Sequence, residues 1–127
     1  MTEKLQIYRC EICGNVVQIL SEGADALVCC GEEMRLQDVQ HDKNELGEKH
    51  SPKAEENEGR KIIHVKTHPM IKEHYIEFIQ VRSNDKREFY TKFFYPGESP
   101  ELDVTNFPED ITAIEYCNIH HLWGMND

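Results

Sequence analysis

The chain has 127 residues, the length of one ordinary domain or of one such domain with a very small one beside it. Acidic residues outnumber basic ones by 24 to 14, and the net charge of -10 argues against a nucleic-acid binder, which needs a basic face for phosphates. The same charge argues against attraction to an anionic membrane and, taken alone, against capture of an anionic substrate.

The sequence predicts a protein of the cytoplasm. No apolar run approaches the roughly 18–20 residues of a membrane span, and the first ten residues, MTEKLQIYRC, contain no apolar stretch of the signal-peptide kind. Disulfides are a poor use of cysteine in a reducing compartment, and five cysteines cannot all pair within one chain. We therefore expect the cysteines, together with the seven histidines, to bind metal.

Residues 1–37 are predicted to form a small cysteine-bearing domain. Its strand candidates are short and are separated by glycine turns, a pattern typical of a metal knuckle and not of a large core. They lie at residues 5–8, 16–20, 27–28 and 34–36.

Residues 38–127 are predicted to form a second, larger domain. The stretch 38–61 is polar, and we interpret it as linker and loop. The following strand candidates are rich in β-branched and aromatic residues and lie at 62–65, 74–81, 88–95 and 112–117. A turn at 83–86 predicts that the second and third of these pair as a hairpin. No segment of ten or more residues keeps a 3.6-residue apolar period, so the fold is predicted to be all-β, with a β-sandwich as the larger domain.

Four cysteines form the first predicted metal site. Cys10 and Cys13 lie on one tight turn, and the adjacent pair Cys29 and Cys30 follows after fifteen intervening residues. Four thiolates around a tetrahedral ion are the usual set for zinc or for a single iron. Spacing alone favours zinc, and a purely structural knuckle is the plainer interpretation. Adjacent cysteines must splay to reach one ion, which should distort the tetrahedron.

A second group of metal-binding side chains could converge from distant positions. Its members are His50, His68, His74, Cys117 and His120. Taken singly, each has a plainer interpretation, as a buried cysteine or as a surface or hydrogen-bonded histidine. The pair Cys117 and His120 is close enough in sequence to chelate one ion, and a chain that already carries four grouped cysteines favours a second metal site.

Five motifs occur in an order shared with a known family. They are Tyr8-x-Cys10-x-x-Cys13-Gly14-Asn15; Val28-Cys29-Cys30-Gly31-Glu32-x-Met34; Glu48-Lys49-His50; His68-Pro69-Met70 with His74-Tyr75-Ile76-Glu77; and Glu115-Tyr116-Cys117-Asn118-Ile119-His120. On these motifs the sequence resembles desulfoferrodoxin, the two-iron form of superoxide reductase. The resemblance covers nearly the whole chain, although residues 53–60 and 96–110 contribute little to it.

The resemblance implies two iron ions per chain. The first would lie in a desulforedoxin-like domain over residues 1–37, held by Cys10, Cys13, Cys29 and Cys30. The second would lie in an immunoglobulin-like β-sandwich over residues 38–127, with four equatorial imidazoles and an axial thiolate from His50, His68, His74, His120 and Cys117. His120 would bind through Nδ1 and the other histidines through Nε2. The remaining histidines, His41, His64 and His121, match no ligand position and are expected to be surface or packing residues.

The resemblance also implies an activity, the one-electron reduction of superoxide to hydrogen peroxide in defence against oxidative stress. Lys49 would attract the superoxide anion and organise a water that protonates the product. Glu48 would occupy the sixth iron position in the ferric state and leave on reduction. Without the resemblance, both would be interpreted as solvated charges in a polar stretch. Reduced rubredoxin is the family's usual electron donor, and a homodimer is its common assembly.

Two other functions stay open from the sequence. A superoxide dismutase would use similar steering but would also oxidise superoxide, so evolution of oxygen separates it from a reductase. A non-catalytic rubredoxin-like electron carrier, or a zinc-binding structural module, would use residues 1–37 alone, and the zinc form would be colourless. The four-cysteine site could carry electrons or serve structure only.

Overall fold

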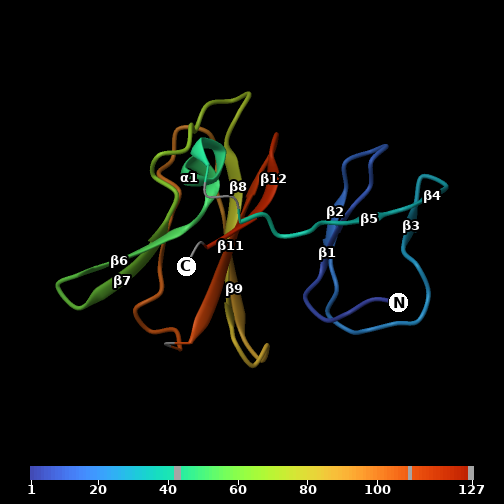
Figure 1. Cartoon of the computed structure of the whole chain (residues 1–127), viewed down its shortest axis with the longest axis horizontal. Coiled ribbons are helices and arrows are strands. Elements are labelled where there is room, and N and C mark those ends of the chain that lie inside the picture. The colour runs from blue at the N-terminus through green and yellow to red at the C-terminus, as the bar shows by residue number, and fades with distance from the viewer. Residues whose placement is uncertain (42–43, 109, 126–127) are drawn as a thin grey trace. The chain divides into compact units, whose positions relative to one another are not determined.

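In the computed structural model, antiparallel strands account for the regular structure of the described residues, apart from one short helix (Figure 1). The described residues are 1–41, 44–108 and 110–125. Residues 42–43 of the predicted linker and 126–127 of the predicted larger domain therefore lie outside them. The contacts divide the chain into two units, Met1–Asp38 and Val39–Asp127.

The first unit has short strands around its cysteines. Their bounds are β1 (Ile7–Arg9), β2 (Val16–Gln18), β3 (Val28–Cys29), β4 (Glu32–Glu33) and β5 (Arg35–Leu36). Three of them form an antiparallel sheet in the order β2-β1-β5, and β3 pairs with β4. The buried apolar side chains described in this unit are Leu5, Ile7, Cys10 and Ile19. So small a core is typical of a unit that needs a metal to fold.

The second unit contains helix α1 and two sheets. The bounds are α1 (Glu45–His50), β6 (Lys53–Asn57), β7 (Arg60–His64), β8 (Ile76–Ser83), β9 (Phe89–Phe93), β10 (Glu101–Asp103), β11 (Ile111–Cys117) and β12 (His121–Gly124). One sheet has the order β10-β7-β6 and the other the order β12-β11-β8-β9, with antiparallel pairing throughout. The predicted fold class, all-β with a four-cysteine domain and a β-sandwich, is confirmed.

The hydrophobic core of the second unit joins its two sheets. Its buried members are Ile63, Val65, Ile76, Ile79, Val81, Phe94, Leu102, Val104, Ala113 and Cys117. Because the cluster takes side chains from strands of both sheets, the sheets pack face to face as in a sandwich. Cys117 ends β11 inside this cluster and is 0% exposed. The core therefore fixes one of the predicted metal ligands directly.

Some elements differ from the predictions. The stretch 38–61 is not all linker and loop, because it contains α1, β6 and the start of β7. The helix has six residues, too few to show a helical period, and β6 is exposed at every position, so neither carries an apolar pattern. The last predicted strand, at 112–117, corresponds to β11. The sequence did not predict β12, which follows it, or β10, which precedes it. The predicted hairpin is confirmed as β8 paired with β9.

Helix α1 places His50 at its last position. The Asn44 side chain accepts a hydrogen bond of 3.0 Å from the Gly47 N–H and so caps the first turn. The Ser51 N–H donates to the Gly47 carbonyl at 2.8 Å. The next residue is Pro52, which has no N–H and cannot extend the helix. His50 is thereby held at a fixed helix end and is 1% exposed.

Candidate metal centres

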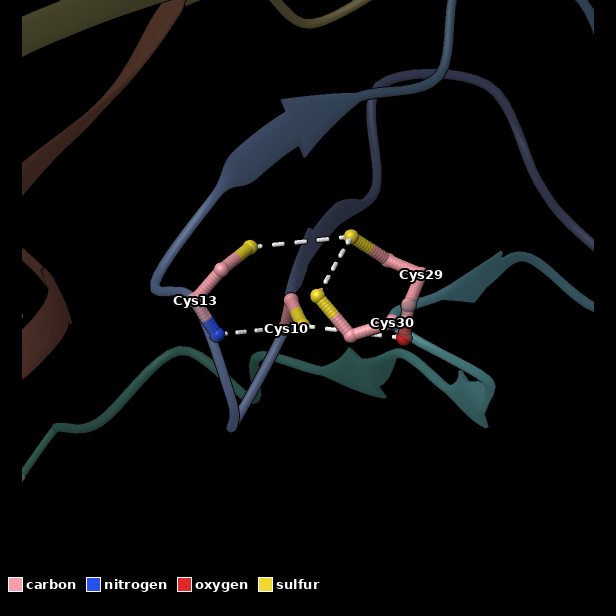
Figure 2. A group of neighbouring side chains, drawn as sticks. All are labelled: Cys10, Cys13, Cys29 and Cys30. Carbon is pink, nitrogen blue, oxygen red and sulfur yellow. Dashed lines mark hydrogen bonds between the residues drawn. The ribbon is translucent and has the colours of Figure 1, made fainter.

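The four cysteines of the first unit gather around one point (Figure 2). Their sulfur atoms all lie within 4.8 Å of one another. The Cys13 and Cys29 sulfurs are 3.6 Å apart and those of Cys29 and Cys30 are 3.9 Å apart, far longer than a disulfide bond of about 2.05 Å. A tetrahedral ion with metal–sulfur distances of about 2.3 Å has sulfur–sulfur edges of about 3.7–3.8 Å. The thiols thus fit a four-coordinate zinc or iron ion.

Left-handed backbone conformations bring the two cysteine pairs to that point. Gly14 has φ +82° and Gly31 has φ +78°, values that glycine adopts without the steric cost of a Cβ. Cys30 itself has φ +55°, which is uncommon for a residue with a side chain. This turn at Cys30 lets two adjacent side chains point into one site. The predicted distortion of the tetrahedron stays a prediction.

The thiols of this group influence one another's protonation. The Cys13 backbone N–H donates to the Cys10 sulfur at 3.5 Å and is the main cause that lowers the pKa of Cys10 to about 6. Hydrogen bonding with the Cys13 side chain raises the pKa of Cys30 to about 12. A metal cation resolves this competition because it binds all four sulfurs as thiolates. The group is therefore suited to a cation and poorly suited to remain as four free thiols.

The second group gathers side chains from four separate segments of the second unit. His50 ends α1, His68 lies in the turn after β7, His74 precedes β8, and Cys117 and His120 flank the turn from β11 to β12. The ligand atoms of His50, His74, Cys117 and His120 lie within 4.8 Å of one another. His68 falls outside this mutual distance, but its ring lies 4.7 Å from that of His50 and 4.6 Å from that of His74.

The four imidazole rings form a closed cycle. Besides the two contacts of His68, the ring centroids of His74 and His120 are 5.2 Å apart and those of His120 and His50 are 4.7 Å apart. Across the cycle, the centroids of His50 and His74 are 6.2 Å apart. Neighbouring rings are inclined by 64–81°, so they stand edge to face. Four imidazoles in this arrangement can direct one nitrogen each toward a common centre.

Hydrogen bonds fix which nitrogen is available. The Nδ1 atom of His50 lies 2.8 Å from the Leu46 carbonyl and that of His68 lies 2.6 Å from the Pro69 carbonyl. A carbonyl can only accept, so each Nδ1 carries the proton and each neutral ring has a free electron pair on Nε2. The Nε2 atoms of His50, His68 and His74 are buried and have no hydrogen-bond partner among the described residues. Buried acceptors without partners are costly unless a cation binds them.

Burial also favours the neutral rings that a metal needs. It lowers the pKa of His68 to about 4 and lowers the pKa values of His50 and His74 as well. Desolvation raises the pKa of the Cys117 thiol, while backbone N–H groups of His120 and Ile119 lower it. The His120 N–H donates to the Cys117 sulfur at 3.4 Å. These donors in the turn would stabilise a thiolate at this buried position.

Asn118 holds the turn between Cys117 and His120 in place. Its Oδ1 accepts a hydrogen bond from the Tyr75 N–H at 2.9 Å, and its Nδ2 donates to the Glu73 carbonyl at 3.1 Å. Both partners are neighbours of His74 in sequence. The segment that carries His74 is therefore tied to the turn that carries Cys117 and His120.

Sequence reasoning missed two residues that support the site. The Trp123 ring stacks on His50 with centroids 4.9 Å apart, and its Nε1 donates to the His120 carbonyl at 3.0 Å. The Gln40 side chain donates to the same carbonyl at 2.9 Å. Trp123 lies on the missed strand β12, so its inward position had no periodic signal. It was nevertheless the single tryptophan of the chain and close to a predicted ligand.

One face of the histidine cycle opens on a hollow of about 460 Å³. It is lined by Leu46, Lys49, His50, Thr67, His68, Pro69, His74 and His120. Lys49 is about half exposed, and its ammonium lies 3.6 Å from a carboxylate oxygen of Glu45. Glu48 is exposed and is not among the lining residues. The structure thus brings Lys49 to the mouth of the site, whereas a role for Glu48 stays a prediction.

The other three histidines make separate contacts. His64 is half-buried on β7, with Nε2 3.6 Å from a Glu55 carboxylate oxygen. His41 is exposed with Nδ1 3.1 Å from the Met125 carbonyl, and His121 stacks on Tyr116. Among the described residues, neither metal-binding group includes any of these histidines.

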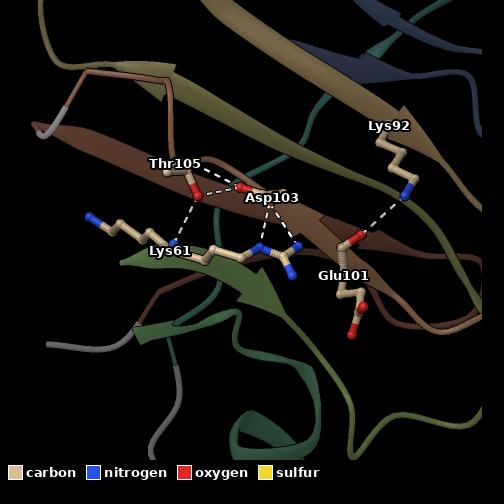
Figure 3. Close-up of polar contacts among 6 residues, drawn as sticks. Lys61, Lys92, Glu101, Asp103 and Thr105 are labelled. Carbon is tan, nitrogen blue, oxygen red and sulfur yellow. Dashed lines mark hydrogen bonds and ion pairs between the residues drawn. The ribbon is translucent and has the colours of Figure 1, made fainter. Parts of the chain in front are cut away.

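A polar cluster away from both groups joins β7 to β10 (Figure 3). The Arg60 guanidinium donates two hydrogen bonds, of 2.9 and 3.1 Å, to one Asp103 carboxylate oxygen. Thr105 donates to the other oxygen from its backbone N–H at 2.9 Å and from its hydroxyl. These donors, with the Thr105 hydroxyl as the largest cause, lower the pKa of Asp103 to about 2.

Comparisons with known proteins cover nearly all of the chain. The family model described as "Desulfoferrodoxin, N-terminal domain" matches residues 2–37, and that described as "Desulfoferrodoxin" matches residues 42–126. A desulfoferrodoxin homolog of Archaeoglobus fulgidus is 42% identical over 97% of this chain and 98% of its own. The desulfoferrodoxin of Desulfarculus baarsii is 40% identical over 97% of each chain.

A solved structure supports the fold. The superoxide reductase of Treponema pallidum covers 98% of both chains with a TM-score of 0.68 and 22% sequence identity. At that identity the likeness concerns the arrangement of the backbone. Separately, none of the helices in the described part of the chain has the length and apolarity needed to cross a bilayer.

Proposed function

The chain belongs to the desulfoferrodoxin family, and on this premise we propose that it reduces superoxide to hydrogen peroxide at the group formed by four histidines and Cys117. The balance is one superoxide, one electron and two protons for each hydrogen peroxide. The two donor groups match the two iron centres of the family. Bound at the second group in its ferrous state, iron would supply the electron.

One observation favours this function over a structural or electron-carrying role. Four imidazole rings stand in a closed cycle, three of them with buried Nε2 atoms that have no described partner, and a buried sulfur lies within reach of three of the four. A closed four-cysteine group would suffice for structure or for electron carriage. The histidine group adds an accessible face at the hollow, where a small molecule can approach.

The residues around that hollow supply what a small anion needs. Lys49 places a positive charge at its mouth, which attracts superoxide against the net charge of -10. The same ammonium can order a water that delivers protons to the product. Glu48, exposed on the same helix, would be the replaceable carboxylate ligand of the oxidised site. The protein contributes steering and proton delivery, and the neutral imidazoles and Cys117 thiolate hold the redox ion.

Other parts of the proposal concern partners. The four-cysteine centre would pass electrons toward the histidine centre, with reduced rubredoxin or a similar small electron carrier as donor. We further propose a homodimer in the cytoplasm. The donor and the homodimer are what the family resemblance implies, and the cytoplasm is what the sequence predicts. Each proposal has its own measurement: donor oxidation kinetics, sedimentation, and fractionation of cells.

Rapid mixing or pulse radiolysis with the reduced, iron-loaded protein tests the activity. We expect superoxide to be consumed with formation of hydrogen peroxide and oxidation of the protein, without release of oxygen. Oxygen evolution in catalytic cycles would make the protein a dismutase. If the reduced protein does not react with superoxide, a role as a non-catalytic electron carrier is the remaining interpretation. Metal analysis with visible spectra separates iron from zinc, because iron thiolates absorb visible light and zinc thiolates do not.

A further inference from the structure

The C-terminal end of helix α1 has a backbone acceptor that the helix itself cannot satisfy. In an α-helix, the carbonyl of residue i accepts from the N–H of residue i+4. For Glu48 that residue is Pro52, which has no N–H. The Glu48 carbonyl therefore needs a donor from elsewhere, and this carbonyl belongs to the turn that presents Lys49 and His50.

Two side chains supply that donor. The Lys53 ammonium donates to the Glu48 carbonyl at 2.7 Å and lies 3.4 Å from the Ser51 carbonyl. The Thr67 hydroxyl lies 3.4 Å from the Glu48 carbonyl and can donate to it. The contact of Lys53 is the shorter one, and a charged donor makes it stronger than a neutral hydrogen bond.

One donor lies at the start of a strand and the other lies in the turn that carries a predicted ligand. Lys53 begins β6 and lies opposite His64 of β7 in the antiparallel register. Thr67 directly precedes His68 and lines the hollow. The Glu48 carbonyl thus connects the helix that carries His50 with the strand β6 and with the turn that carries His68.

We propose that Lys53 is a positioning residue, whose ammonium takes the place of the missing Pro52 N–H and fixes the last turn of α1 with Lys49 and His50. The functional part of this statement rests on the proposed superoxide reductase activity. Lys53 does not line the hollow, so it acts through the backbone of α1 and not by contact with substrate.

The mutation Lys53→Met tests this role, because methionine has a similar shape and no donor. Lys53→Arg restores a charged donor. Lys86→Met is the matched control for loss of one positive charge, since Lys86 lies in the turn after β8, at the opposite end of that strand from His74 and about 25 Å along it. Each variant is prepared as the full iron-loaded chain.

Three readouts are compared: hydrogen exchange of the peptide covering residues 44–52, transfer of iron from the histidine site to a chelator, and the rate with superoxide. For Lys53→Met we expect exchange to rise about fivefold, as for loss of one hydrogen bond. We expect faster iron release and a rate with superoxide lowered at least about threefold. Lys53→Arg should return all three toward wild type, and Lys86→Met should leave exchange and iron release unchanged.

The outcomes are distinguishable. Unchanged exchange in Lys53→Met overturns the proposal, and so does an equal loss of rate in Lys86→Met, which would mean that only net charge matters. Faster exchange with unchanged iron release and unchanged rate refutes the positioning of the site. If the wild-type chain does not reduce superoxide, the proposed function fails, while exchange and iron release still decide the role of Lys53.

Discussion

The pair of Glu45 and Lys49 offers a prediction about the rate of superoxide capture. Both residues lie on α1, one turn apart, and the Lys49 ammonium is 3.6 Å from a Glu45 carboxylate oxygen. Lys49 is the cation at the mouth of the hollow, so its pairing with Glu45 withdraws positive charge from the site. The mutation Glu45→Gln keeps the size of the side chain and removes the competing anion. We expect it to accelerate the reaction.

The expected magnitude follows from the geometry. Two unit charges 3.6 Å apart in bulk water attract by about 1.2 kcal/mol before entropy and salt are considered. Exposed pairs at this helical spacing contribute only about 0.3–0.5 kcal/mol. Both side chains are well exposed, so the range of about 0.3–0.5 kcal/mol applies here and the Coulomb value of about 1.2 kcal/mol does not. This free energy corresponds to about a twofold change in the fraction of Lys49 that is not paired with Glu45. The second-order rate with superoxide should therefore rise about twofold at low ionic strength and return to the wild-type value in high salt.

Pulse radiolysis at a series of salt concentrations measures this change. Glu58→Gln is the matched control, because it removes one negative charge at the tip of the β6–β7 hairpin, at the opposite end of β6 from Lys53 (Figure 1). In a Lys49→Ala background, which should itself slow the reaction, Glu45→Gln should have no more effect than the control. Equal acceleration by Glu45→Gln and Glu58→Gln would refute the reasoning, since it would show that only the net charge matters.

Three further predictions concern metal retention and stability. His50→Ala should lower the iron content of the histidine site, measured by metal analysis, and full occupancy would count against His50 as a ligand. Ile79→Ala, at a core position that is 0% exposed, should reduce the free energy of unfolding by about 2–5 kcal/mol in urea titrations, and a loss below about 1 kcal/mol would contradict the described packing. Because the pKa of Asp103 is lowered from 3.8 to about 2, its contribution to stability is present above pH 4 and is lost as the pH falls toward 2. The difference in Tm between wild type and Asp103→Asn should accordingly shrink over that range, and a constant difference would disprove the linkage.

Much of the site could be predicted because its residues carry unambiguous chemistry. The two cysteine pairs predict a metal site from their spacing alone. The strand β8 has an apolar and aromatic pattern strong enough to predict its hairpin with β9. Helix α1 could not be predicted in the same way. Its formation depends on a cap at Asn44 and on Pro52, and not on an apolar face that a pattern could reveal.

The convergence of the histidines has a similar explanation. The sequence offered His50, His68, His74 and His120 as candidates that could converge on one ion. Only the resemblance joined them into one ligand set, since nothing local brings these separate segments together. Their rings meet because β8 and β11 pair along seven positions and carry His74 and Cys117 to the same end of the sheet. Pairing between strands that are far apart in the sequence produces no local sequence pattern. The contact of Trp123 with His50 likewise joins residues that are far apart in the sequence, so it could not be predicted either.

The placement of the ligands along the chain also sets an order of events during synthesis. The four-cysteine group is complete when residue 30 has been made, within a unit of its own. The histidine group needs a residue as late as His120, and its strands β8 and β11 close a long loop before they pair. A ribosome-bound chain can therefore take up its first metal ion once Cys30 is available, whereas the second ion must wait until His120 has also been translated.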